Sequence, residues 1–78
     1  MSESRLVYMA NQIATYFRTQ PHDEAVASTL GHLKMFWEPR MRRQILEHLE
    51  HHHGEGLNEI ALAAIKRWAE EQQTKLSA

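Results

Sequence analysis

The chain has 78 residues, no cysteine and a formal net charge of −1 with its histidines neutral, which predicts one small domain with little net stability to spare. The absence of cysteine excludes disulfides and thiolate metal cages and fits an intracellular protein. A nearly balanced charge argues against a general nucleic-acid binder, and the absence of a long apolar run argues against a membrane span or an export signal.

The first predicted helix covers residues 4–18. Its apolar residues recur at three- and four-residue steps, as on one stripe of an amphipathic helix. They are Leu6, Met9, Ala10, Ile13, Tyr16 and Phe17. Asn11 and Gln12 lie at the edge of this stripe, where they are either solvated or form hydrogen bonds across an interface or toward Trp37.

The second predicted helix covers residues 21–37 and begins with Pro21, which suits a first helical turn. Its core face consists of Val26, Leu30, Leu33 and Trp37, flanked by Thr29 and Phe36. Gly31 lies on the far side in mid-helix, where glycine costs about 1 kcal/mol relative to alanine. Close approach of another backbone would explain its presence.

The third predicted helix covers residues 39–53. Pro39 ends the preceding helix because the residue before proline avoids the helical region. It also suits the start of a new helix, where its missing N–H has no intrahelical acceptor to lose.

Three arginines follow at once, at the positive end of the new helix dipole: Arg40, Arg42 and Arg43. Each misplaced charge costs about 0.3–1 kcal/mol at low salt. Either nearby acids such as Glu38 and Glu47 screen these charges, or another molecule supplies the counter-charge. Arg42 borders the apolar side of the helix, so it either extends its charged end to water or binds a carboxylate or carbonyl across an interface.

His48 and His52 stand at i and i+4, a spacing that can hold a transition metal. Such a site needs a further ligand from elsewhere, for example His32. The alternative is a solvated, partly packed histidine cluster at a helix C-terminus. We favour this alternative and assign no metal site.

Gly54 suits a left-handed helix end, and Asn58 suits the N-cap of a fourth helix over residues 59–73, with Leu57 packed on Leu62. The apolar face of this helix contains Ile60, Ala61, Leu62, Ala64, Ile65, Trp68 and Ala69. A face this wide exceeds what one neighbouring helix covers, so part of it could meet a second chain. The four helices predict an all-α fold, a small helical bundle forming a single domain over residues 1–78 with frayed ends.

Common catalytic motifs are missing from the sequence. It has no glycine-rich phosphate loop, no serine elbow and no pair of carboxylates in an evident apolar pocket. A helical bundle of this size also offers little concavity for excluding water. We expect that this chain is not an enzyme by itself.

Two motifs carry a family resemblance. Met9-Ala10-Asn11-Gln12-Ile13 is followed at the right distance by Phe36-Trp37-Glu38-Pro39-Arg40-Met41-Arg42. With shorter matches over about residues 5–65, they closely resemble the delta subunit of NAD-dependent, molybdenum-containing formate dehydrogenase. The histidine run before Gly54 departs from the family pattern, which argues against a family function for these histidines.

The resemblance implies a non-catalytic accessory subunit of a cytoplasmic complex that oxidises formate to carbon dioxide and reduces NAD. It implies that the molybdenum pterin cofactor, the iron–sulfur clusters and the flavin belong to partner subunits, and that this chain holds no cofactor. The delta chain would support assembly or stability of the complex by docking on its catalytic alpha subunit.

The docking surface is predicted at the break between the second and third helices, because Trp, Arg and Met are enriched at interfaces. The predicted partner-binding residues are Phe36, Trp37, Pro39, Arg40, Met41, Arg42, Arg43, Asn11 and Gln12. Isolated chains could pair as a two-fold dimer. Two other classes stay open: a helix-turn-helix nucleic-acid binder that reads bases with its third helix, and a histidine-rich metal-handling module. We expect neither nucleic acid nor a membrane as a partner.

Overall fold

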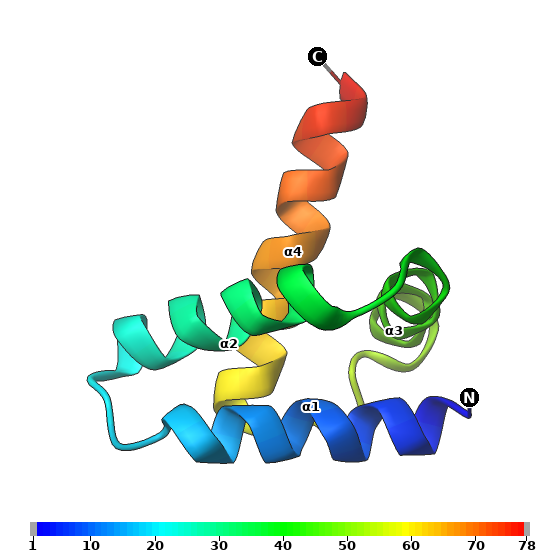
Figure 1. The fold of residues 1–78 in the computed structure, drawn as a ribbon. Coiled ribbons are helices and arrows are strands. Elements are labelled where there is room, and N and C mark those ends of the chain that lie inside the picture. The colour runs from blue at the N-terminus through cyan, green and yellow to red at the C-terminus, as the bar shows by residue number, and fades with distance from the viewer. Residues whose placement is uncertain (1, 78) are drawn as a thin grey trace.

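Four helices make up the described chain (Figure 1). The computed structural model describes residues 2–77, with side chains described as far as residue 73. The helices are α1 (Glu3–Phe17), α2 (His22–Phe36), α3 (Pro39–His52) and α4 (Glu59–Ser77), and residues 2–77 contain no strand.

The all-α prediction is confirmed. The first three helices agree with their predicted bounds to within one residue, whereas α4 continues four residues beyond the predicted end at residue 73. Met1 and Ala78, at the ends predicted to fray, lie outside the described residues. Within the described range, no helix has both the length and the apolar character needed to cross a bilayer.

The helices are arranged around α4. In Figure 1, α1 and α2 run antiparallel and α4 crosses both of them, with its outer half standing out beyond the other helices. Only Trp37 and Glu38 separate α2 from α3, yet α3 packs against α1 and α4 and diverges from α2. The space that this divergence leaves beside α4 matters for the candidate site.

The core contains side chains from every helix. Its members are Leu6, Ala10 and Ala14 of α1, Val26, Leu30 and Leu33 of α2, Trp37, Ile45 of α3, and Ala61, Ala64, Ile65 and Trp68 of α4. Small alanine side chains in α1 and α4 are thus combined with large side chains from α2, its linker and α4, which suits the close packing of protein interiors.

Two aromatic residues expected at or beside the core are exposed instead. Tyr16 is 79% exposed and Phe36 is 63% exposed. The core stripe of α1 centres on Ala10, and Tyr16 lies six residues further on, about 120° around the helix. The prediction for Tyr16 was wrong because the stripe follows small alanines, including Ala14, rather than the larger apolar residues.

The turn between α3 and α4 combines left-handed residues with a side-chain cap. His53 has a φ of 57° and Gly54 a φ of 72°, so the left-handed turn begins one residue before the predicted glycine. The Oδ1 atom of Asn58 accepts a hydrogen bond from the Ala61 N–H at 2.9 Å, which confirms the predicted cap. A Cβ atom on Gly54 would stand 2.6 Å from Leu62 Cδ1, so glycine is required there by space as well as by φ.

Gly31 has no such requirement. It is exposed in the middle of α2, and a Cβ atom there would meet no group within 4 Å. The close approach that could explain this glycine is therefore not made by any described part of the chain.

Replacing Gly31 by alanine should raise the free energy of unfolding by about 0.5–1 kcal/mol, because alanine restricts the unfolded chain and displaces nothing in the folded one. Thermal unfolding followed by circular dichroism would measure the change. Gly54→Ala is the matched control and should lower the stability, since it adds the same methyl group at a left-handed position beside Leu62. A Gly31→Ala melting temperature at or below that of the parent would contradict the expectation.

Candidate docking site

The segment that joins α2 to α3, residues 36–43, is called the cationic corner below. Its backbone leaves the helical region at Trp37 (φ −87°, ψ 130°) and Glu38 (φ −68°, ψ 156°), and α3 begins at Pro39 as predicted. The Trp37 N–H donates to the Leu33 carbonyl at 2.9 Å, so the last turn of α2 is closed. The first turn of α3 contains no acidic residue, and the Glu38 side chain forms no capping hydrogen bond with the described residues.

The side chains of the cationic corner divide into buried and exposed groups. Trp37 is 8% exposed and belongs to the core. Met41 and Arg42 are half-buried, whereas Phe36, Pro39, Arg40 and Arg43 are exposed. Trp37 therefore fastens the corner to the core, and Phe36 is the aromatic side chain that this conformation presents to solvent.

The arginines of the corner lack acidic partners. Among the described residues, no ion pair joins Arg40, Arg42 or Arg43 to a carboxylate. Glu38 and Glu47, the acids expected to screen them, are therefore not in direct contact with these guanidinium groups. Three positive charges remain beside the positive end of the α3 dipole, which is an unfavourable arrangement for the isolated chain.

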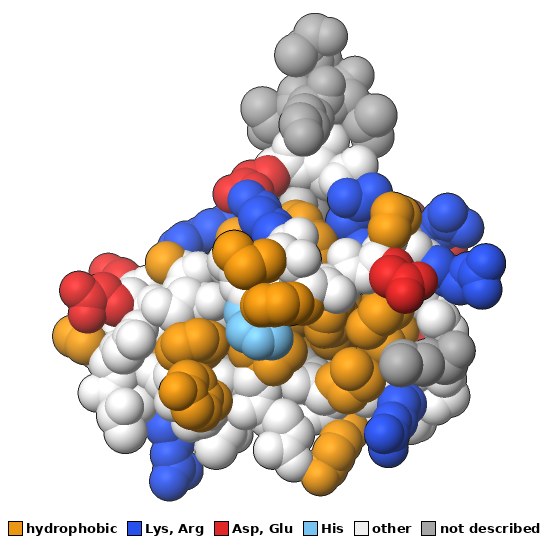
Figure 2. Space-filling model, in the orientation of Figure 1, with side chains coloured by type: hydrophobic (Ala, Val, Ile, Leu, Met, Phe, Trp, Pro, Cys, Tyr) orange, Lys and Arg blue, Asp and Glu red, His pale blue; other side chains and the backbone are white. Residues whose placement is uncertain are grey.

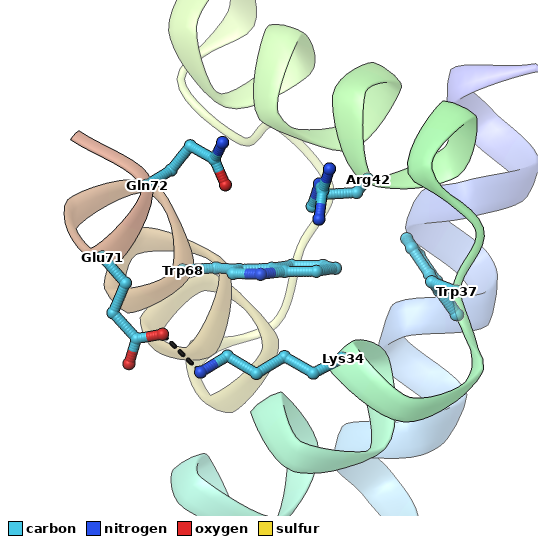
Figure 3. A pocket seen from close by; sticks show the side chains of 6 residues that line it. All are labelled: Lys34, Trp37, Arg42, Trp68, Glu71 and Gln72. Atoms are coloured by element: carbon cyan, nitrogen blue, oxygen red, sulfur yellow. Dashed lines mark ion pairs between the residues drawn. The ribbon is translucent and has the colours of Figure 1, made fainter. Parts of the chain in front are cut away.

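Arg42 lines a groove where α2, α3 and α4 meet (Figure 3). The groove has a volume of about 280 Å³ and is lined by Lys34, Trp37, Arg42, Trp68, Glu71 and Gln72. It lies where α2 and α3 diverge while α4 passes beside both of them. We call it the Trp68 groove, after the indole ring at its centre.

The charges in the Trp68 groove do not cancel. Arg42 and Lys34 lie on opposite sides of the Trp68 ring, and Lys34 forms an ion pair with Glu71 (Figure 3). Both members of this pair have side chains that are 46% exposed, so the pair contributes little to stability. The pair does engage Glu71, the one acid among the described residues that line the groove, and Arg42 is the cation there that no described acid pairs with.

Comparison with known proteins decides the family. Residues 5–65 match the family model of the NADH-dependent formate dehydrogenase delta subunit, FdsD. The chain belongs to the FdsD family. This confirms the resemblance found in the sequence motifs, and it makes the chain a subunit of a formate dehydrogenase complex with partner subunits. No similar protein was found among curated sequences, and no similar chain was found among solved structures.

One of the two polar residues in the first FdsD motif stabilises the fold of this chain. The Nδ2 atom of Asn11 donates to the Gly56 carbonyl at 2.9 Å, and its Oδ1 atom accepts from the Asn58 N–H at 2.8 Å. Asn11 therefore connects α1 to the turn before α4. Its side-chain hydrogen bonds are made there and not to Trp37 in the cationic corner. Gln12 instead donates from Nε2 to the Tyr8 hydroxyl at 2.6 Å on the exposed side of α1.

His48 also has a role within this FdsD chain. It is 7% exposed, and its Nε2 atom lies 2.8 Å from the Glu55 carbonyl oxygen. A carbonyl oxygen only accepts hydrogen bonds, so Nε2 carries the proton. The Nδ1 atom lies 3.3 Å from Glu3 Oε1, which places the ring between the start of α1 and the turn after α3.

The two metal-ligand candidates lie together without completing a site. The rings of His48 and His52 have centroids 5.6 Å apart, but a metal on His48 Nε2 would have to displace the Glu55 carbonyl. Across the described side chains, no group of three or more His, Asp or Glu residues is placed to hold a metal ion. His32, considered as a third ligand, packs between Phe17 and Phe36 instead.

The sequence analysis missed a hollow between α1 and α2. This aromatic hollow has a volume of about 450 Å³ and is lined by Gln12, Ile13, Tyr16, Phe17 and His32. Figure 2 shows hydrophobic side chains gathered over α1 and α2 on this face, with Lys and Arg side chains nearer its margins. The i, i+4 spacing of His32 and Phe36 indicates that these two rings meet on α2. Periodicity within one helix does not show which aromatic residues of two helices meet.

Replacing Asn11 by alanine should lower the free energy of unfolding by about 1–3 kcal/mol, because the Gly56 carbonyl and the Asn58 N–H would lose their partner. Urea unfolding of the isolated chain would measure this loss. Gln12→Ala, next along the same helix, is the control and should stay within about 0.5 kcal/mol of the parent, since Gln12 is exposed. Equal stabilities for the two variants would contradict a structural role for Asn11.

Proposed function

We propose that this chain is a non-catalytic accessory subunit that docks on the catalytic alpha subunit of its formate dehydrogenase complex through the cationic corner. Docking would support assembly or stability of the complex. The observation that carries the proposal is the set of three arginines that no described acid neutralises, in a chain whose family consists of subunits of such a complex.

The partner subunit would supply the negative charge that the three arginines lack. Positive groups at a helix N-terminus are repelled by the dipole, and no described acid forms an ion pair with these three arginines. An acidic patch on the partner would remove the repulsion on binding and would also accelerate association. Binding would therefore be favoured by relief of the repulsion between the arginines and the α3 dipole, which persists in the free chain.

The composition of the corner also suits an interface. Phe36 and the adjoining Met35 are 63% and 76% exposed, and large apolar side chains beside arginine are typical of docking surfaces. Trp37 and Pro39 would act indirectly, by holding the corner in its extended conformation. Met41 is half-buried, so it is intermediate in exposure between the buried Trp37 and the exposed Phe36.

The redox chemistry is assigned to the partner subunits in this proposal. The chain contains no cysteine, so it offers no thiolate for an iron–sulfur cluster. The molybdenum pterin, the clusters and the flavin would then be held by other chains. The cytoplasmic location implied by the resemblance is part of the same proposal.

Reversing the two exposed arginines, Arg40→Glu with Arg43→Glu, should reduce recovery of this chain with the alpha subunit by about tenfold or more. The complex would be purified from the native host through a tag on the alpha subunit, and the delta chain would be quantified by mass spectrometry. The reversal places acids near the start of α3, which the dipole favours, so the isolated variant should be at least as stable as the parent.

Arg5→Glu with Arg18→Glu is the matched control, because it makes the same charge change at two exposed positions, one in the first turn of α1 and one at its C-cap. We expect this control to be recovered at parent levels. Undiminished recovery of a folded Arg40 and Arg43 variant would refute docking through the cationic corner.

A further inference from the structure

We propose that Arg42 binds a single carboxylate side chain of the partner subunit in the Trp68 groove. This inference rests on the proposed docking function and identifies the chemistry of one contact within it. It concerns a different side chain from Arg40 and Arg43, which are exposed and do not line the groove.

Arg42 differs from its neighbours Arg40 and Arg43 in its burial. It is half-buried at the border of α3, and its guanidinium group lies in the groove beside the Trp68 ring (Figure 3). Trp68 is 5% exposed and belongs to the core, so it forms a fixed wall. A half-buried arginine has less side-chain freedom to lose when it binds a planar carboxylate through its fork of N–H donors.

The charge of the groove selects an anion. Among the side chains described as far as residue 73, its ionisable residues are Lys34, Arg42 and Glu71, and the ion pair between Lys34 and Glu71 leaves one positive charge on Arg42. A partly desolvated guanidinium without an ionic partner is costly, and an incoming carboxylate would offset that cost. Gln72 lines the same groove and adds an amide that can form a further hydrogen bond.

The surroundings favour one carboxylate over a polyanion. A neighbouring cavity of about 260 Å³ shares Arg42 and Gln72 with the groove and is also lined by Glu47 and Glu50. These acids would repel a chain of phosphates, whereas one Asp or Glu side chain needs only one cation, and Arg42 has no ionic partner among the described residues. The partner residue is therefore an acid that projects into the groove.

The groove includes residues beyond the matched family segment. The FdsD match ends at residue 65, whereas Trp68, Glu71 and Gln72 belong to the outer half of α4. The inference thus gives a role to residues of α4 that lie beyond the matched segment.

A competition within the native host tests the inference. Cells would produce the parent chain and one variant together, the complex would be purified through the alpha subunit, and mass spectrometry would give the ratio of the two chains. Arg42→Met keeps a long side chain against Trp68 but removes the charge and the fork, so it should be about tenfold under-represented. Arg42→Lys keeps the charge alone and should fall between Met and the parent. Arg18→Met is the control for loss of one exposed positive charge and should be incorporated equally.

A second variant leaves Arg42 in place. Gln72→Glu puts a carboxylate inside the groove, where it would compete for Arg42, so this variant should also be under-represented without loss of thermal stability. Gln73→Glu makes the same charge change at the next, exposed residue, which is not among the residues lining the groove, and should be incorporated equally.

The outcomes separate the two proposals. Equal incorporation of Arg42→Met, or of Gln72→Glu, with the parent chain would overturn the inference while docking itself stands. Absence of the parent chain from the purified complex would overturn the proposed function and the inference with it.

Discussion

The two-residue connection between α2 and α3 sets the arrangement on which the candidate site depends. The helical path of α2 ends at Trp37, Pro39 keeps Glu38 extended, and burial of Trp37 fastens the connection to the core. Because α3 then packs on α1 and α4 and diverges from α2, a groove remains beside Trp68. The same connection places three arginines at the start of a helix, so one local constraint produces both the groove and its uncompensated charge.

The first turns of α1, α2 and α4 carry the caps or acidic residues that favour a helix start, whereas the first turn of α3 does not. Ser2 caps α1 through the Arg5 N–H at 3.1 Å, Asp23 and Glu24 occupy the first turn of α2, and Asn58 caps α4. Only α3 begins with arginines and no acid in its first turn. A consistent sequence that breaks a rule at one place is typical of a functional site, and this contrast is the physical support for docking at the corner.

Several residues that looked functional in the sequence are used within the chain. Asn11 and His48 both hold the turn between α3 and α4, through the backbone of Gly56, Asn58 and Glu55. Their partners lie far away in the sequence or within a turn, so spacing along a helix could not indicate them. Conversely, Tyr16, which periodicity assigned to the core, is exposed and lines an aromatic hollow between two helices.

The sequence by itself determined the helices and the family, because proline, glycine, caps and apolar periodicity act over a few residues and because the two motifs are specific. It also located the unusual arginines, since charge near a proline start is a local feature. Only the tertiary structure decided which face of each helix is buried and which charges are paired. Those outcomes depend on how the helices cross. The buried face of α1 is centred on small alanines, and Lys34 pairs with Glu71, whereas Arg42 has no ionic partner among the described residues.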